Sequence, residues 1–450
     1  MKRKNPFISL LLLITVSPIS FADTLKDAIE NTLNTHPEIS AASNSRYSAE
    51  KNVRAAQGGY LPSISLNAGI GKENLDTPST RAQNSSNDIL TRRETTINLS
   101  QRVFDGFETS NTVAQQKATV NSRAYKMLNT SEARALDAVQ AYLDVLQRHE
   151  FLTLAEENLS TNQRIYDQIK LRSEQGVGRL ADLEQAEARV AQARNNVLTE
   201  QTNLTDAESN YFSVVGKEPV GLQIPSNESL NVPATLVDAK RVMVANSPIL
   251  KSADSDIEAT RKQYEAQKSG FYPKFNVELA RTLNENIDGT RGKYNEWQAM
   301  LRMRYNLYEG GSTKATLESK AFQIKEAEDV RNNTLRQLNE ELRLSWSAMN
   351  NARQQLPIAQ EYAERSRRVR DAYQKQFSLG ERTLLDVLDS ENERFTAQRR
   401  MVEIRYLSLY SEYRLKARMG DLLNSLSIPA PSAGQSLSAV NTQVDLPDLQ

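Results

Sequence analysis

The sequence predicts a mainly α-helical protein that also contains two β-hairpins, and three observations predict this fold class. The segment from Phe107 to Gln175 contains neither Gly nor Pro and is rich in Ala, Gln, Glu, Arg and Leu, which are good helix formers. Four other segments alternate apolar and polar residues with the period of two that is typical of strands. Both patterns occur twice, in the same order, in two halves of the chain.

Residues 1–22 have the pattern of a secretory signal peptide. Lys2 to Lys4 precede the apolar run from Phe7 to Val16, and Ser20 to Ala22 fit a cleavage site with small residues at its ends. The apolar run is about half as long as the roughly 20 residues that a transmembrane helix needs. We therefore expect export with removal of this segment, and a mature chain without a spanning helix.

An internal repeat organises the rest of the chain. The halves share matched positions: Thr24–Leu25 with Thr235–Leu236, Gly59–Pro62 with Gly270–Pro273, Phe104–Gly106 with Tyr308–Gly310, Asp182 with Asp386, and Gly216 with Gly420. A repeat of about 200 residues indicates a duplicated domain rather than a solenoid of short units. We assign the first repeat to 23–216, a linker with Pro and Gly to 217–234, and the second repeat to 235–424. Residues 425–450 are rich in Ser and Pro, and we expect a poorly ordered tail.

Each half should contain two long helices separated by a break at Gly. At 1.5 Å per residue, the segment from Phe107 to Gln175 would form a rod on the order of 100 Å long. After Gly176, apolar residues from Leu183 to Tyr211 recur with the 3/4 spacing of a coiled-coil seam. The alternative is an amphipathic helix on a globular core, which the persistence of this spacing disfavours. In the second half we expect Pro357 to kink or break the rod, because it lacks an N–H.

The predicted strands are apolar on one face and polar on the other. They contain Ile64–Ile70, Ile97–Val103, Phe275–Leu279 and Trp297–Leu307. In the last strand, Arg302 faces opposite to the apolar residues. This alternation matches a barrel with lipid outside and water inside, and it fits a soluble antiparallel sheet packed on a helix equally well.

Four strands are too few for a membrane-spanning barrel, because barrels of a single chain start at about eight. Open strand edges would leave N–H and C=O groups unpaired in lipid. If the strands enter a membrane, we therefore expect several copies of the chain to share one barrel with closed cyclic symmetry. The strand arithmetic leaves two, three or four copies open.

Composition excludes several classes of function. The chain has 56 Lys and Arg against 56 Asp and Glu, so it lacks the basic excess of a nucleic-acid-binding protein. It has no Cys, which excludes a disulfide framework, a Cys zinc site and a lipidated N-terminal Cys. His36 and His149 have no ligand neighbours at a metal-binding spacing. With no Gly-rich phosphate loop and no Ser/His/Asp order, we predict neither an enzyme nor a metal or cofactor site.

The segment Leu379–Asp389 (Leu-Gly-Glu-Arg-Thr-Leu-Leu-Asp-Val-Leu-Asp), together with the signal peptide, the repeat, the hairpins and the rods, resembles the TolC family of outer-membrane channels. The resemblance covers about residues 24 to 423. It implies a homotrimer in the outer membrane of a Gram-negative bacterium, with a 12-stranded β-barrel continued by a long α-helical coiled-coil tunnel across the periplasm. The outer-membrane lipid would then face Trp297, Leu301, Met303 and Leu307.

The resemblance implies an exit duct that works with a periplasmic membrane-fusion adaptor and an inner-membrane ABC transporter or other pump. Many efflux-only relatives carry a lipidated N-terminal Cys that this chain lacks, so we expect type I secretion of protein, with multidrug or small-molecule efflux as the alternative. A periplasmic coiled-coil adaptor would explain the rods but not two hairpins at matching positions. A secreted hydrolase would need an acid, base or nucleophile constellation, which the sequence lacks.

The resemblance also implies a gate at the periplasmic end. Asp386 and Asp389 correspond to the family's two acidic rings, whose carboxylates would attract cations and raise one another's pKa. Arg382 corresponds to its linking Arg, and Asp182 to the acidic partner of that Arg across neighbouring helices. Phe377 stands where the family's best-known member has a linking Tyr, and Ala181 where it has a Thr, so we expect fewer hydrogen bonds to hold this gate. Without the resemblance, these charges would be interpreted as a solvated helix turn.

Overall fold

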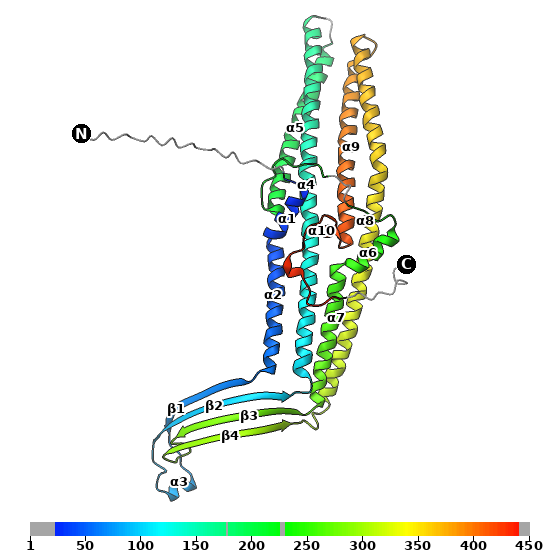
Figure 1. Cartoon of the computed structure of the whole chain (residues 1–450). Helices are drawn as coiled ribbons and strands as arrows, with labels where there is room; N and C mark the ends of the chain where they lie inside the picture. The colour runs from blue at the N-terminus through cyan, green and yellow to red at the C-terminus, as the bar shows by residue number, and fades with distance from the viewer. Residues whose placement is uncertain (1–22, 177–178, 226–229, 441–450) are drawn as a thin grey trace, which may run out of the picture. The chain divides into compact units, whose positions relative to one another are not determined.

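The computed structural model describes residues 23–176, 179–225 and 230–440 (Figure 1). This part of the chain is mainly helical and contains one antiparallel sheet of four strands, which confirms the predicted combination of long helices and two hairpins. The predicted signal peptide, residues 1–22, lies outside the described residues. Within the described ranges, no helix is both long enough and apolar enough to cross a membrane.

The chain divides into two compact units, and each unit takes segments from both sequence repeats. The first unit comprises Met1–Thr32, Asp137–Asn227 and Leu356–Tyr406. The second comprises Leu33–Leu136, Glu228–Gln355 and Leu407–Gln450. The units therefore do not coincide with the repeats, and the predicted repeat boundaries stay a prediction about the sequence.

The long helices α4, α5 and α9 coincide with segments that contain neither Gly nor Pro, whereas α8 contains Pro357. The helices are α1 (Leu25–Thr35), α2 (Pro37–Gln57), α4 (Glu108–Glu174), α5 (Leu180–Val215), α6 (Leu236–Asn246), α7 (Pro248–Gln267), α8 (Ser312–Ser378), α9 (Leu384–Arg418) and α10 (Leu422–Ser425). His36 caps α2, because its Nδ1 accepts a hydrogen bond from the amide of Glu38 at 3.2 Å. Gly216 ends α5 with φ of +85°, a conformation that favours Gly.

Of the kink or break expected at Pro357, the break does not occur, and the kink stays a prediction. Pro357 lies inside α8, which continues to Ser378. A proline in a helix interior costs about 3 kcal/mol, but it removes only one N–H. The helix buries Ala352 and Ala359 on either side of Pro357, and we attribute its continuation to this packing.

The second unit contains the sheet, in which neighbouring strands are consecutive in the chain. Its strands are β1 (Ser63–Glu73), β2 (Leu90–Phe104), β3 (Lys274–Glu285) and β4 (Lys293–Arg304), paired antiparallel in that order. The short helix α3 (Pro78–Ala82) lies in the loop between β1 and β2. The two hairpin loops contact each other, since Arg291 pairs with Asp88 at 3.1 Å.

The register places most apolar residues of the four strands on one side, which we call the apolar face; Leu90, Tyr294 and Met300 lie on the other side. Residues directly opposite each other in a sheet share a face. The apolar face carries Ile64, Leu66, Ala68, Ile70, Ile97, Leu99, Phe275, Val277, Leu279, Leu283, Trp297, Ala299, Leu301 and Met303. Arg302 lies on the opposite, polar face, where its Nε donates to Glu278 Oε2 at 2.5 Å. Leu307 lies beyond the end of β4 at Arg304, and contact of this face with lipid stays a prediction.

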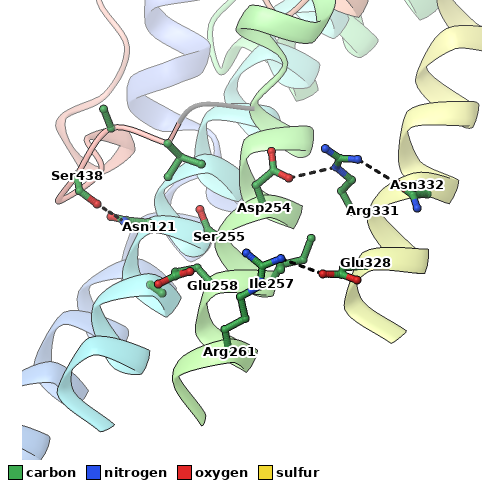
Figure 2. A pocket seen from close by; sticks show the side chains of 13 residues that line it. Asn121, Asp254, Ser255, Ile257, Glu258, Arg261, Glu328, Arg331, Asn332 and Ser438 are labelled. Carbon is green, nitrogen blue, oxygen red and sulfur yellow. Dashed lines mark hydrogen bonds and ion pairs between the residues drawn. The ribbon is translucent and has the colours of Figure 1, made fainter. Parts of the chain in front are cut away.

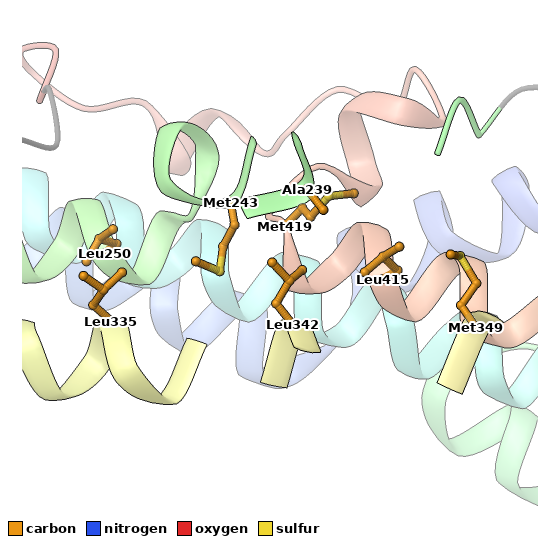
Figure 3. Packing of buried hydrophobic residues seen from close by; sticks show 8 residues of the cluster. All are labelled: Ala239, Met243, Leu250, Leu335, Leu342, Met349, Leu415 and Met419. Atoms are coloured by element: carbon orange, nitrogen blue, oxygen red, sulfur yellow. The ribbon is translucent and has the colours of Figure 1, made fainter. Parts of the chain in front are cut away.

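A hydrophobic core holds the helices of the second unit together (Figure 3). Met243 from α6, Leu250 from α7, Leu342 from α8 and Leu415 from α9 are fully buried in it. After α9, Gly420 has φ of +66°, and a Cβ there would lie 2.8 Å from Pro248 Cδ. Only Gly therefore fits the approach between this turn and the start of α7.

The segment after α10 has an ordered path, although we expected a poorly ordered tail from residue 425. Asn121 of α4 makes hydrogen bonds to two adjacent residues of this segment. Its Oδ1 accepts from the amide of Leu437 at 2.7 Å, and its Nδ2 donates to Ser438 Oγ at 2.8 Å. A Cβ on Gly434 would collide with the side chain of Leu128. The composition of the segment could not predict this path, because the path depends on hydrogen bonds to a single distant residue, Asn121. Residues 441–450 lie outside the described residues.

In the first unit, the predicted seam of α5 is buried. Its buried residues are Ala186, Val190, Ala193, Val197, Leu204, Ala207 and Tyr211. Glu200 interrupts the apolar spacing, and it is also buried, where it pairs with Arg399 of α9.

Candidate functional site

The predicted gate residues lie at the helix ends of the first unit, where α4 meets α5 and α8 meets α9. A hydrophobic cluster joins these ends. Its buried members are Ile165, Ile169, Ala186, Leu384, Val387 and Leu388, with Tyr166, Leu183 and Phe377 packed against them. Because the cluster draws residues from all four helices, it fixes the turn between α8 and α9 against the start of α5.

Local sequence determines the turn between α8 and α9. Gly380 has φ of +81°, and the amide of Glu381 donates to the carbonyl of Gln376 at 2.9 Å, which closes the end of α8. Thr383 then caps α9, because its Oγ1 accepts from the amide of Asp386 at 3.3 Å. Asp386 Oδ2 accepts in return from the amide and the hydroxyl of Thr383, at 3.1 and 2.8 Å. Asp386 is therefore part of a capping box.

The capping box sets the charge of Asp386. Hydrogen bonds from Thr383 lower the pKa of this carboxyl below its usual value, and the nearby Arg382 adds to the effect. Asp386 is therefore ionised at neutral pH within a single chain. The mutual raising of pKa values that the resemblance implies would need carboxylates from other copies.

Arg382 has three neighbours within its own chain. Its Nε donates to Gln376 Oε1 at 3.1 Å, its guanidinium carbon lies 4.2 Å from the centre of the Tyr373 ring, and Asp386 Oδ2 lies 4.0 Å from its Nη1. Asp182 is not among these neighbours. It is half-buried at the start of α5 and makes no side-chain hydrogen bond or ion pair with the described residues. The predicted latch between Arg382 and Asp182 does not form within one chain and stays a prediction for an assembly.

Asp389 has a partner that sequence reasoning missed. Arg189 of α5 donates from Nη2 to Asp389 Oδ1 at 3.1 Å, and the carboxylate is 58% exposed. The two acidic residues therefore have different local roles, since Asp386 caps a helix and Asp389 bridges α9 to α5. Nothing in the sequence around Arg189 signals this contact.

A buried ion cluster lies beside the gate residues on α9. Glu391 receives two hydrogen bonds from Arg394, at 3.0 and 2.6 Å, and one from Asn158 Nδ2 of α4 at 3.1 Å. Nε of Arg370 from α8 lies 3.3 Å from Glu391 Oε2. The side chains of Glu391 and Arg394 are 1% and 6% exposed. In the sequence they form an ordinary i,i+3 pair, which is usually solvated, so burial could not be predicted.

The described residues contain no group of three or more His, Cys, Asp or Glu side chains placed to hold a metal ion. The second unit contains a polar cavity, which is lined by none of the predicted gate residues (Figure 2). Arg331 pairs with Asp254 at 3.2 Å and Arg261 with Glu328 at 2.9 Å within the cavity, and Glu258, which also lines it, pairs with Lys262 of α7 at 3.4 Å. The cavity therefore does not present a free charge to a ligand.

Comparisons with known proteins place the fold among bacterial outer-membrane proteins. A sequence model of the family described as "Outer membrane efflux protein" matches residues 28–217 and 242–421. Outer membrane efflux protein BepC of Brucella suis is 26% identical over 372 residues, covering 81% of this chain and 78% of BepC. Outer membrane protein TolC of Salmonella enteritidis is 22% identical, with 97% and 92% covered. Proteases secretion protein PrtF of Dickeya chrysanthemi is 23% identical, with 98% and 97% covered.

Solved structures share the fold. The crystal structure of the Campylobacter jejuni CmeC outer membrane channel superposes with a TM-score of 0.76 at 15% sequence identity, over 88% of this chain and 86% of CmeC. At this identity the likeness concerns the fold alone.

Proposed function

Because this chain belongs to the outer membrane efflux protein family, we propose that it is the exit duct of a type I secretion system and exports protein through a channel built by three copies. The coarser function is established: the chain is an outer-membrane efflux channel of the TolC type, located in the outer membrane of a Gram-negative bacterium, and not an enzyme.

The observation that carries the trimer is the open, one-sided sheet. β1 and β4 form its edges within the chain, and its apolar face is exposed at Ile64, Leu66, Trp297 and Leu301. Edge N–H and C=O groups in lipid must be paired. Three copies of four strands, the number that the family resemblance implies, would pair every edge in one closed barrel and turn the apolar face to lipid.

One fact supports secretion of protein over efflux of small molecules: the chain is similar over nearly its whole length to a relative named for protease secretion. The similarity to BepC, a relative named an efflux protein, favours small-molecule efflux as the second candidate. In either case we propose that a periplasmic membrane-fusion adaptor and an inner-membrane ABC transporter or other pump engage the channel.

We assign the periplasmic gate of this channel to the α8–α9 turn. Three copies would bring Asp386 and Asp389 into two acidic rings, while Arg382 would reach Asp182 of a neighbouring copy. Asp182 supports this assignment because it lacks a partner among the described residues of its own chain. In planar bilayers, changing both ring residues to Ala should remove block by multivalent cations without closing the pore. Undiminished block would place the constriction elsewhere.

The function is tested by deleting the gene and measuring two outputs in the same strain. We expect a protein to disappear from the culture supernatant while susceptibility to small toxic compounds stays unchanged. The reverse result would establish small-molecule efflux. The mass of the purified, detergent-solubilised particle tests the assembly separately, and a monomer or an even-numbered ring would refute it.

A further inference from the structure

One rim of the apolar face is basic. Lys72, Arg93, Arg281 and Lys293 all lie on this face, and we call them the basic rim. Lys72, Arg93 and Lys293 lie at or near the strand ends that lead into the hairpin loops, and Arg281 lies four residues before the end of β3. Arg93 and Lys293 flank Glu285 in one row of directly opposed residues. Arg281 lies two rows further along the strands, between Ile97 and Trp297. All four basic side chains belong to exposed residues.

Most of this positive charge is uncompensated. Among these four, Arg93 alone has an anionic partner in the described part of the chain, Glu285 at 3.0 Å. Lys72 donates to the neutral hydroxyl of Thr91 at 2.8 Å. Arg281 and Lys293 make no side-chain hydrogen bond or ion pair with the described residues. Three cations at this end of the face, where Thr91, Thr95 and Asn295 are the neutral polar residues, are therefore available to an external anion.

The opposite rim, where the strands join the helices, is aromatic instead. Phe104 packs edge-on against Phe107 at 5.5 Å between ring centres and against Tyr272 at 6.5 Å. The apolar-face positions at this end, which include Phe275, Leu301 and Met303, contain no Lys or Arg. The two rims thus differ in chemistry, aromatic at one end and cationic at the other.

We propose that the basic rim binds the phosphate groups of an outer-leaflet lipid, a lipid A-type glycolipid whose acyl chains lie along the apolar face. This inference rests on the proposed barrel, which turns the apolar face to lipid. Aromatic residues mark barrel interfaces, and cations beside anionic head groups favour binding by about fivefold each. A guanidinium matches phosphate oxygens with paired hydrogen bonds. Arg281 lies directly opposite Trp297, which places it at the depth of the membrane interface. From there the long side chain of Arg281 extends toward the head groups.

The geometry also explains why the site needs acyl chains. Arg281 lies four residues from Glu285 along β3, about 13 Å at the usual rise. On β3 the apolar Leu283 lies between them, in a row with Ala68, Thr95 and Asn295. A ligand that reaches both levels of the basic rim must combine phosphate with apolar surface. Free phosphate satisfies only one of these requirements.

The test uses the full-length assembly in phosphatidylcholine nanodiscs that contain a small fraction of bisphosphorylated lipid A. Lipid retained by the protein after mild detergent extraction is measured by native mass spectrometry. We expect retention of bisphosphorylated lipid A, and loss of retention when its phosphates have been removed. Arg281→Gln should weaken retention about fivefold and Lys72→Gln with Lys293→Gln about 25-fold, while Arg281→Lys should keep most of it.

The matched control is Arg304→Gln. Arg304 is also an exposed strand Arg without an ion pair to the described residues, but it lies on the polar face at the other rim. Equal loss in Arg304→Gln, equal retention of dephosphorylated lipid, or displacement by an equal concentration of inorganic phosphate would overturn the inference. A particle that is not a trimer or does not insert refutes the proposed function instead, whereas an inserted trimer without phosphate dependence refutes only this inference.

Discussion

Replacing Glu391 by Gln should destabilise the first unit by about 3 to 5 kcal/mol, the usual cost of breaking a buried ion pair by removing one partner. Glu391 is the anion shared by Arg394 and Arg370, and its side chain is 1% exposed. Gln keeps the shape and one acceptor for Asn158 but removes the charge. Arg394, 6% exposed, is then left buried without a counterion.

A second substitution separates charge loss from lost packing. Arg394→Met added to Glu391→Gln should recover most of the loss, because replacing a buried pair by apolar groups is often neutral. Arg370 does not repeat the problem, since its side chain is 20% exposed and it also contacts Asp371 at 3.3 Å. The matched control is Glu403→Gln, which removes the anion of the exposed pair with Arg400 on the same helix. That change should cost at most about 1 kcal/mol.

The assay is unfolding of the detergent-solubilised protein in guanidinium chloride, followed by circular dichroism of the helices. All variants must be compared at the same protein concentration, because the apparent stability of an oligomer depends on it. Equal midpoints for Glu391→Gln and Glu403→Gln would show that the cluster is not buried in the working protein. A double variant as unstable as Glu391→Gln alone would show that the cost arises from packing rather than from the stranded charge.

Three further predictions concern the membrane, the gate and pH. Leu301→Arg should cost about 2 to 4 kcal/mol if Leu301 lies at mid-membrane, and heat-modified mobility of membrane fractions should show impaired insertion; normal insertion would contradict the assigned face. Arg382→Ser with Asp182→Ala should raise single-channel conductance in planar bilayers, and unchanged conductance would exclude the latch. Burial raises the pKa of Glu132 from 4.5 to about 7, although the amides of Leu422 and Leu423 donate to it and oppose the shift. The folded state thus holds the proton more tightly, so stability should fall by at most about 3 kcal/mol as pH rises from about 4.5 to 7; Glu132→Gln should flatten this profile, and an unaltered profile would assign it to another group.

Periodic features of the sequence predicted the elements well, whereas contacts between distant side chains could not be predicted. The seam from Leu183 to Tyr211 and the alternation around Leu301 depend only on local spacing, and the structure shows both. The continuous helix at Pro357 depends on packing on either side of it. The partnership of Arg189 with Asp389 joins two helices through residues with no shared pattern. The gate at Asp182, Arg382, Asp386 and Asp389 stays a prediction of the resemblance, and the capping role of Asp386 appeared only in the structure.

The consecutive strand order has a consequence for biogenesis under the proposed assembly. Every strand pairing inside the sheet joins consecutive strands of one chain, so a single copy can form the four-stranded sheet without a second copy. The pairing of β1 with β4 of another copy is a bimolecular step, because two chains must first meet. Its rate therefore falls as the protein concentration falls. A newly exported copy therefore has two unpaired strand edges, β1 and β4, until it assembles with other copies. Refolding at several protein concentrations should therefore show helix formation at a constant rate and trimer formation at a rate that rises with concentration.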